Sequence, residues 1–176
     1  MRIIGGFHKK RQITLPSKID ISPTTDFAKE ALFNILRYYT DFIDIDVLDL
    51  FSGTGNLSYE FASRGAKNVI AIEKDEFWYK FILQNIEKIK LQSISVYQVD
   101  AFQYIANSYD RFDIIFADPP YNIENIEKIP DLIFDNKLLN DEGLLIIEHS
   151  AKISFQNHPR LIDHRAYGKV NFSFFQ

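Results

Sequence analysis

From residue 46 onward, short apolar runs alternate with longer stretches whose apolar residues recur at helical spacing. The runs predict strands at 46–51, 68–73, 94–99, 112–117 and 143–148. The intervening stretches predict helices at 56–64, 75–90, about 101–108 and about 123–138, the last kinked at Pro130. Four of the five strands are almost continuously apolar, as expected when helices cover both faces of a sheet. This alternation predicts an α/β fold with a mostly parallel sheet.

The N-terminal end departs from this alternation. Residues 2–5 and 11–15 predict two short strands around a basic turn, so we expect residues 1–22 to form a basic β-hairpin arm. The main domain is then expected to span residues 23–176. It begins with a helix capped near residues 24–26. The apolar face of that helix comprises Ala28, Ala31, Leu32, Ile35, Leu36 and Tyr39.

The C-terminal end predicts an antiparallel hairpin. Strand-like stretches at roughly 160–166 and 169–175 flank Gly168, which can form the turn between them. We therefore expect this hairpin to extend the parallel sheet at one edge.

Composition narrows the possible chemistry. The 176 residues suit one domain and include no cysteine, which excludes disulfides, thiolate catalysis and cysteine-ligated zinc. The four histidines show no metal-ligand spacing, so we expect no metal site. Because there is no apolar run of membrane-spanning length and no signal-peptide pattern, we expect a cytoplasmic protein that does not associate with membranes.

The net charge of −4 conceals an asymmetry between the arm and the rest of the chain. The first 19 residues carry five basic side chains and no acid, which leaves −9 on the remainder. The basic residues of the arm include Arg2, Lys9, Lys10 and Arg11. Such an arm suits a polyanion such as RNA, although an ordinary solvated hairpin would show the same charge.

Ligands of open parallel sheets lie outside the carboxyl ends of the strands, so the strand tips are where chemistry is expected. The first tip reads VLDLFSGTGN at residues 47–56, and its glycines allow a sharp turn and a close approach of the backbone to a ligand. The dinucleotide fingerprint would require a third glycine where this chain has Ser58. A plain tight turn between strand and helix remains the alternative.

The second and third tips also end in acids. Glu73 follows the glycine turn by about twenty residues, the distance at which an acid can accept hydrogen bonds from ribose hydroxyls. The alternative is an exposed Glu73 followed by a helix capped by Asp75. At the third tip, Asp100 could accept from an adenine amino group while Phe102 packs on the base. Together the three tips indicate a nucleoside site.

The fourth tip, FDIIFADPPYN at residues 112–122, ends a buried strand in an acid, two prolines and an aromatic residue. The prolines stiffen the turn and remove donors, so we expect Asp118 and the nearby carbonyls to face a ligand rather than intrachain amides. Tyr121 provides a plane on which a base could stack. A strand-terminating turn is the alternative for this motif alone.

These motifs resemble the class I S-adenosylmethionine-dependent methyltransferases, and the whole chain is similar to the RsmD-type 16S rRNA (guanine-N2)-methyltransferases. The resemblance is carried by RIIGG at 2–6, the basic turn at 8–11, PTTD at 23–26, KEALFNIL at 29–36, VLDLFSGTGNL at 47–57, SRGA at 63–66, EKD at 73–75, FDIIFADPPY at 112–121, GLLIIE at 143–148 and RAYG at 165–168. The chain departs from the family in having Ser22 and Phe27 where arginines are common, and in its lysine-rich turn.

The resemblance implies a Rossmann-like class I methyltransferase fold with a seven-stranded sheet, and S-adenosylmethionine as cofactor. Its implied cofactor-binding residues are Asp49, Phe51, Ser52, Gly53, Thr54, Gly55, Asn56, Glu73, Lys74, Asp100, Ala101 and Phe102. Its implied catalytic residues are Asp118, Pro119, Pro120 and Tyr121, and its RNA-binding residues are Arg2, Lys9, Lys10 and Arg11. The implied partner is 16S rRNA, free or in a small-subunit particle, bound by a monomer.

Three other functions are compatible with parts of the pattern. A DNA adenine-N6 methyltransferase shares the Asp-Pro-Pro-Tyr tip, but such enzymes usually need a sequence-reading domain for which this chain has no insertion. A dehydrogenase is disfavoured by Ser58 and by the lack of hydride-transfer residues. A noncatalytic RNA-binding assembly factor would not need the motif at residues 118–121.

Overall fold

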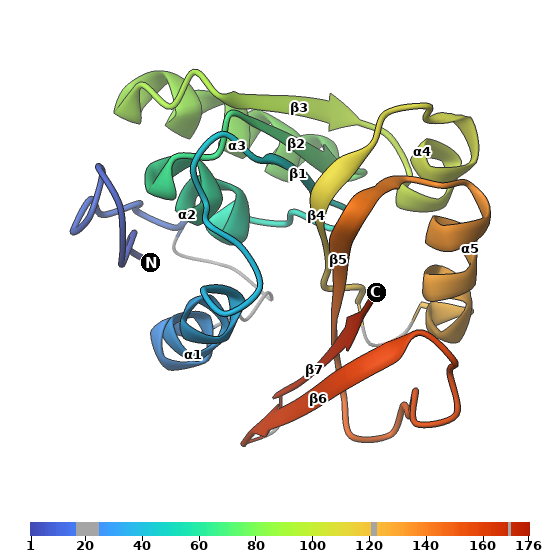
Figure 1. Cartoon of the computed structure of the whole chain (residues 1–176). Coiled ribbons are helices and arrows are strands. Elements are labelled where there is room, and N and C mark those ends of the chain that lie inside the picture. Colours follow the sequence, from blue (N-terminus) through green and yellow to red (C-terminus); the bar gives the residue numbers. More distant parts are fainter. Residues whose placement is uncertain (17–24, 121–122, 169) are drawn as a thin grey trace.

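The apolar runs form a seven-stranded sheet in the computed structural model, which describes residues 1–16, 25–120, 123–168 and 170–176. The strands are β1 (Asp46–Asp49), β2 (Asn68–Glu73), β3 (Ile94–Gln98), β4 (Phe112–Ala117), β5 (Leu139–His149), β6 (Leu161–Tyr167) and β7 (Val170–Phe175). Their order is β3-β2-β1-β4-β5-β7-β6 (Figure 1). The five strands from β3 to β5 pair in parallel, and β7 is antiparallel to both β5 and β6.

Helices cover both faces of the sheet, as the uninterrupted apolar strands require. The helices α1 (Asp26–Leu36), α2 (Asn56–Arg64) and α3 (Glu76–Ile89) pack on one face and share a core with alternate strand residues. The helices α4 (Ala101–Asn107) and α5 (Ile129–Asp135) pack on the other face, where a second core lies (Figure 1). This confirms the predicted fold class. No helix in the described parts of the chain is long and apolar enough to cross a membrane.

Three element boundaries differ from the prediction. The strand β1 ends at Asp49 because the glycine turn begins there, and β5 extends back to Leu139 beyond the predicted 143–148. The helix predicted over 123–138 is replaced by a 3-10 turn at Ile126–Lys128 and the short helix α5. Pro130 lies in the first turn of α5, where its missing N–H leaves no helical hydrogen bond unmade, so it starts a helix rather than kinking one.

The N-terminal segment follows a hairpin course, but its two predicted strands are reduced to one bridge between Arg2 and Gln12. The amide of Ile3 donates to Arg11 O at 3.0 Å, and the amide of Ile13 donates to Met1 O at 2.9 Å. Ile3 and Ile13 are 1% and 2% exposed and belong to the same core as α1 and α2. The segment is therefore packed onto the main domain. A boundary at residue 22 remains a prediction, because residues 17–24 lie outside the described parts of the chain.

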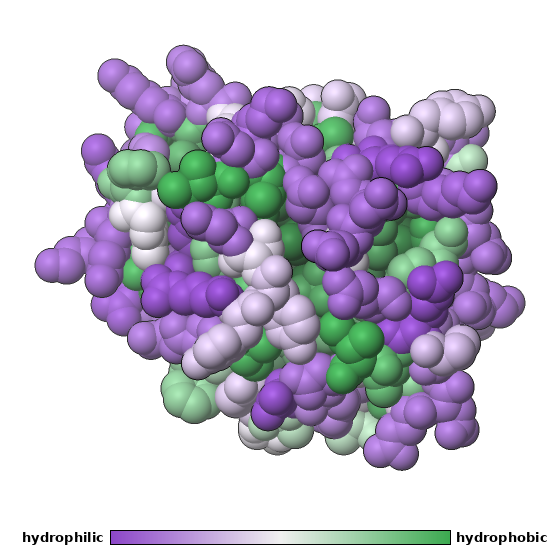
Figure 2. Space-filling model, in the orientation of Figure 1, coloured by the Kyte–Doolittle hydropathy of each residue, from purple (hydrophilic) through white to green (hydrophobic). Residues whose placement is uncertain are grey.

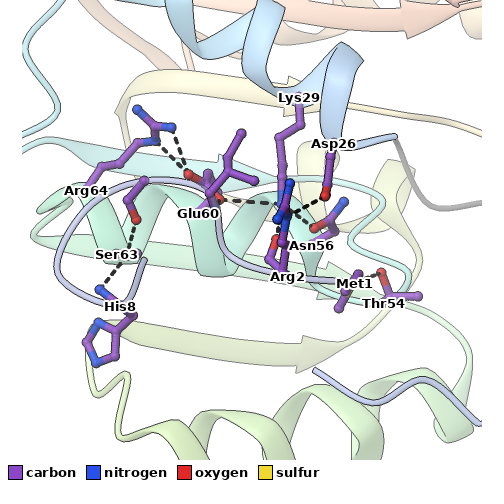
Figure 3. A network of polar contacts seen from close by, with 12 residues as sticks. Met1, Arg2, His8, Asp26, Lys29, Thr54, Asn56, Glu60, Ser63 and Arg64 are labelled. Carbon is purple, nitrogen blue, oxygen red and sulfur yellow. Dashed lines mark hydrogen bonds and ion pairs between the residues drawn. The ribbon is translucent and has the colours of Figure 1, made fainter. Parts of the chain in front are cut away.

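A buried polar network attaches this segment to α1 and α2 (Figure 3). Lys29 of α1 is 0% exposed, and its ammonium donates to Arg2 O at 2.7 Å and to Asn56 Oδ1 at 2.8 Å. It also pairs with Glu60 at 3.4 Å, and the Glu60 carboxylate accepts from the amide of Ile4 at 2.9 Å. Burial lowers the pKa of Lys29, while the charge of Glu60 opposes that shift.

Residues at the carboxyl end of α2 also hold the N-terminal segment. Arg64 pairs with Glu60 at 2.8 Å, and its guanidinium lies 4.2 Å from the ring centroid of Phe33. Ser63 Oγ donates to Gly5 O at 2.7 Å and accepts from the amide of His8 at 2.9 Å. Residues 4–8 therefore run along α2, with backbone groups bonded to Glu60 and Ser63, which fixes the course of the arm.

We predict that Lys29→Met destabilises the protein by roughly 3 kcal/mol, because a buried carboxylate loses its ammonium partner and the Arg2 carbonyl loses its donor. Thermal unfolding measures the loss, and hydrogen exchange should show faster exchange at the amides of Ile3 and Ile13. The matched control is Lys80→Met, which breaks an exposed pair with Glu76 and should change stability by less than about 0.5 kcal/mol. Equal melting temperatures for the two variants would contradict the network's structural role.

Candidate active site

Four adjacent parallel strands carry an acid at or just beyond their carboxyl ends. In sheet order β2, β1, β4 and β5, these acids are Glu73, Asp49, Asp118 and Glu148. The residues two positions before them are Ala71, Val47, Phe116 and Ile146, all in the core on the α1–α3 face. Because side chains alternate along a strand, the four carboxyl groups lie toward that same face. The sheet thus places four carboxyl groups close together at the carboxyl ends of its inner strands.

The glycine turn after β1 contains two glycines with different constraints. Gly55 has φ 77°, and a Cβ there would lie 2.8 Å from the ring of Tyr59, so both conformation and packing require glycine. Gly53 has φ 50°, but no heavy atom outside residues 52–54 lies within 4 Å of the position that its Cβ would take. The backbone at Gly53 therefore faces open space, as a surface approached by a ligand would.

Glu73 ties the end of β2 to this turn. One of its carboxylate oxygens accepts from the amide of Gly53 at 2.7 Å, and the other accepts from the amide of Asp75 at 2.7 Å. Burial raises the pKa of Glu73, and the two amide hydrogen bonds oppose the shift. The predicted alternative of a helix capped by Asp75 is also present, since Asp75 Oδ1 accepts from the first-turn amides of α3. The exposed Glu73 of that alternative is not observed, because its carboxylate is half-buried and bonded to Gly53, and its role toward a ribose remains a prediction.

Asp49 explains why the third glycine of the dinucleotide pattern is a serine. Asp49 is 2% exposed, and Ser58 Oγ donates to its Oδ2 at 2.5 Å. Burial raises the pKa of Asp49 to about 6, with a smaller contribution from the charge of Glu73, while the serine hydrogen bonds oppose the shift. Ser58 therefore stabilises a buried carboxylate, a role that the pattern of glycines did not reveal.

At the third tip the structure brings together two predicted rings. Phe51 and Phe102 are both half-buried and meet edge to face with centroids 6.3 Å apart. Ala101 beside them is buried. Asp100 caps α4 by accepting from the amides of Phe102 and Gln103, and its other oxygen pairs with Lys74 at 3.1 Å. Both carboxylate oxygens of Asp100 therefore already have partners within the chain.

Two other predicted cofactor-binding residues contact α1 and the N-terminal segment. Asn56 is 6% exposed, and its side-chain oxygen accepts from Lys29 at 2.8 Å. Thr54 Oγ1 lies 3.5 Å from Met1 Sδ (Figure 3). Ser52 is buried, with its hydroxyl donating to Asp49 O at 3.0 Å. These side chains shape the turn, which leaves its backbone as the surface available to a ligand.

Asp118 ends β4 as a half-buried carboxyl group with like charges beside it. Burial raises its pKa well above the usual range, and the charges of Glu148 and Asp49 raise it further. Glu148 is 4% exposed and was missed by the sequence analysis, although it ends the apolar run GLLIIE as the other acids end theirs. Asp118 is therefore a stronger base than an exposed aspartate.

The prolines after Asp118 differ in exposure and in hydrogen bonding. Pro119 is buried and Pro120 is exposed. The Pro120 carbonyl accepts from the amide of Ile123 at 2.9 Å, so the expectation that the carbonyls here lack intrachain donors is wrong for Pro120. The residues that follow, Tyr121 among them, lie outside the described parts of the chain. The stacking role predicted for Tyr121 remains a prediction.

The four predicted RNA-binding residues are exposed, and the turn that holds Lys9, Lys10 and Arg11 folds back beside Arg2, since the amide of Lys10 donates to Ile3 O at 2.9 Å. Arg2 pairs with Asp26 at 2.7 Å at the start of α1 (Figure 3). The turn holding Lys9 and Lys10 follows residues that bond to Ser63, near the carboxyl end of α2. Nine helical residues separate the turn from the glycine loop, a distance of about 13 Å.

Comparisons with known proteins agree with this geometry. A family model described as conserved hypothetical protein 95 matches residues 1–176. Ribosomal RNA small subunit methyltransferase D of Escherichia coli is 30% identical over 179 residues, covering 100% of this chain and 89% of the relative. The chain belongs to the RsmD family. This confirms the resemblance drawn from its motifs.

Other relatives and solved structures extend the comparison. The relative of the same name in Haemophilus influenzae is 30% identical, with 84% of this chain and 78% of the relative covered. The solved structure of Escherichia coli yhhF, named as a methyltransferase, has a TM-score of 0.86 at 30% identity and covers 100% of this chain and 97% of its own. A SAM-dependent methyltransferase of Agrobacterium tumefaciens shares the fold alone, with a TM-score of 0.68 at 18% identity over 94% of this chain and 66% of its own.

We predict that Asp49→Asn stabilises the protein at pH 7 but not at pH 4. The folded-state pKa of about 6 exceeds the ordinary 3.8, so the folded protein binds more protons than the unfolded chain between these values. Wild-type stability should therefore fall as pH rises through this window, by at most about 3 kcal/mol from this group. Asparagine can still accept from Ser58 and has no charge to bury.

Melting temperatures measured from pH 4 to pH 8 test this prediction. The control is Glu87→Gln, which removes an equal charge from the exposed face of α3 and should leave the pH-dependent difference near zero. A constant difference between Asp49→Asn and wild type across the range would refute the assignment of a buried, ionising carboxyl group.

Proposed function

We propose that the protein transfers a methyl group from S-adenosylmethionine to the exocyclic N2 amino group of a guanine in 16S rRNA. The observation that carries this proposal is the Asp-Pro-Pro tip of β4, which lies beside the glycine turn of β1 in a chain whose full-length relatives are named as small-subunit rRNA methyltransferases. An RNA substrate in the ribosome also implies a cytoplasmic protein, and we expect it to act as a monomer.

The residues at the first three tips suit this cofactor. Gly53 leaves an open backbone surface near the amino end of α2, where the helix dipole favours a negatively charged group such as a carboxylate. Glu73 lies where it can accept from ribose hydroxyls, and the Phe51–Phe102 pair provides an apolar wall for an adenine. The gathered acids favour a positively charged ligand over a neutral one.

When bound, the cofactor supplies a methyl group on a positively charged sulfur. The chain's own task is to orient the acceptor amine, whose lone pair is delocalised into the guanine ring. The Asp118 carboxyl and the Pro119 carbonyl accept the two amino hydrogens, which turns the lone pair toward the methyl group. Because Pro119 is buried and the Pro120 carbonyl is bonded to Ile123, these acceptors are held in place before the substrate arrives.

The Asp118 carboxylate can also take the proton that the amine loses on methylation. Burial, and after it the charges of Glu148 and Asp49, raise the pKa of Asp118, which makes its ionised form a better proton acceptor. Tyr121 fixes the plane of the base in this scheme. A guanine stacked in a helix cannot reach the β4 tip, so the substrate base is unpaired or flipped out.

A methyl-transfer assay with labelled S-adenosylmethionine on 16S rRNA, on small-subunit particles and on duplex DNA tests the proposal directly. Mass spectrometry of the nucleosides should then identify N2-methylguanosine. Methylation of DNA adenine would replace the proposal with the DNA alternative, and no transfer to any substrate would favour the noncatalytic assembly factor.

We predict that Glu73→Ala weakens binding of S-adenosylhomocysteine at least about tenfold, because two charge-assisted hydrogen bonds to the ribose are lost. Calorimetry measures the affinity. The matched control is Glu76→Gln, which removes a charge from the exposed first residue of α3 and should bind S-adenosylhomocysteine normally. Unchanged affinity in Glu73→Ala would place the ribose elsewhere.

We predict that Asp118→Ala lowers turnover at least about a hundredfold while cofactor affinity changes by less than about threefold, because the lost acceptor acts chiefly as the amine becomes a nucleophile. The control is Asp113→Asn at the opposite end of the same strand, where the carboxylate accepts from the Asp46 amide and from Asn140. It should retain wild-type turnover. Near-normal methylation by Asp118→Ala would eliminate the proposed role.

A further inference from the structure

We infer that Phe7 is a stacking platform for an RNA base on the strand that flanks the methylated guanine, with Lys9, Lys10 and Arg11 holding the adjacent phosphates. The inference rests on the proposed function, because it assumes that the substrate is RNA. It assigns a role to Phe7, which lies within the arm but outside the set of basic residues predicted to bind RNA. Phe7 is 87% exposed, an unusual state for a phenylalanine.

The exposure of Phe7 is imposed by the backbone. Its amide donates to Ser63 O at 2.7 Å, and the next amide, that of His8, donates to Ser63 Oγ at 2.9 Å. Gly6 has φ 72°, and a Cβ there would lie 1.7 Å from Ser63 O, so only glycine allows this approach. With its backbone bonded to α2, Phe7 is directed away from the core. No ring contact of Phe7 occurs within the described parts of the chain.

Lys10 occupies a backbone conformation that favours glycine. Its φ is 73°, in the left-handed region, and its amide donates to Ile3 O at 2.9 Å, so the conformation is part of the turn. Glycine would fit this position without strain, whereas lysine destabilises the turn. The charge of Lys10 is exposed, three residues along the chain from the exposed ring of Phe7.

Charge complementarity identifies the partner class. The arm is basic and the remaining chain carries −9, so a polyanion is attracted to the turn and repelled by most of the body. Figure 2 shows hydrophilic side chains over much of this face of the molecule, with smaller groups of apolar ones among them. An aromatic ring among cations is the combination by which proteins bind single-stranded nucleic acid, since every base has a face that can stack.

The position of the turn sets the length of RNA required. The nine residues of α2 separate it from the glycine loop by about 13 Å. A stacked strand rises about 3.4 Å per nucleotide along its axis, so about four nucleotides span the distance from the glycine loop to the turn. An RNA with a shorter flank should bind at the β4 tip without reaching Phe7.

Fluorescence anisotropy with two RNAs tests the inference, one carrying the target guanine with ten flanking nucleotides on each side and one with two. For the long RNA, Phe7→Ala should weaken binding at least about fivefold. Phe7→Trp should retain wild-type affinity, while Phe7→Leu should be as weak as alanine because it is apolar but cannot stack. For the short RNA, wild type and Phe7→Ala should bind with the same affinity.

Tyr109→Ala, at a tyrosine 98% exposed on another loop, is the matched control and should bind both RNAs normally.

Lys10→Gly separates binding from folding. It removes the strain, so its melting temperature should equal or exceed that of wild type. Binding to the long RNA should weaken, and the slope of log affinity against log salt should flatten by about 0.7. A lower melting temperature of Phe7→Ala than of wild type would show that Phe7 has a structural role and would overturn the inference.

Other outcomes also decide the matter. Equal binding of the long RNA by wild type and Phe7→Ala would overturn the platform while leaving methylation of RNA by the wild type, and hence the proposed function, intact. A loss confined to small-subunit particles and absent with naked RNA would assign Phe7 to a ribosomal protein and also overturn it. Failure of the wild type to methylate either RNA would instead refute the proposed function.

Discussion

The repulsion among carboxyl groups at the ends of four neighbouring strands is the constraint on which the site depends. Parallel strands place these groups side by side, and Asp118 and Asp49 have raised pKa values because burial and their neighbours oppose ionisation. The surrounding structure offsets this repulsion in part, through the Ser58 hydroxyl on Asp49 and the Gly53 amide on Glu73. What remains favours a cationic ligand, which links the electrostatics of the sheet to the proposed cofactor.

A second buried charge system connects the site to the arm. Lys29 reaches both Asn56 at the start of α2 and the backbone of Arg2, so the helix that follows the glycine turn also holds the N-terminal segment. One short helix therefore determines the positions of the glycine turn in the proposed cofactor site and of the proposed RNA platform. The distance between them is set by the length of the helix rather than by a flexible linker.

The sequence predicted the sheet well because continuous apolar runs and glycine-closed helices are local signals. It also located three of the four acids at the strand tips, Asp49, Glu73 and Asp118, because each closes an apolar run, but it missed Glu148. It did not reveal what those acids contact: Ser58 on Asp49, Lys29 on Asn56 and Lys74 on Asp100 are contacts between residues 9 to 27 positions apart in the chain. Two strands of the arm were overpredicted because their apolar residues pack against α1 and α2 instead of forming a ladder.

The placement of β7 between β5 and β6 affects how the sheet is completed. In chain order β6 precedes β7, yet β6 has no direct pairing with β5 in the sheet. Until β7 inserts, the edge of β5 presents unpaired amides and carbonyls, and Phe172 and Phe174 are missing from the core. During folding, this open edge is a point at which two chains could pair with each other. A truncation that removes only Val170–Phe175 should therefore promote aggregation far more than its length suggests.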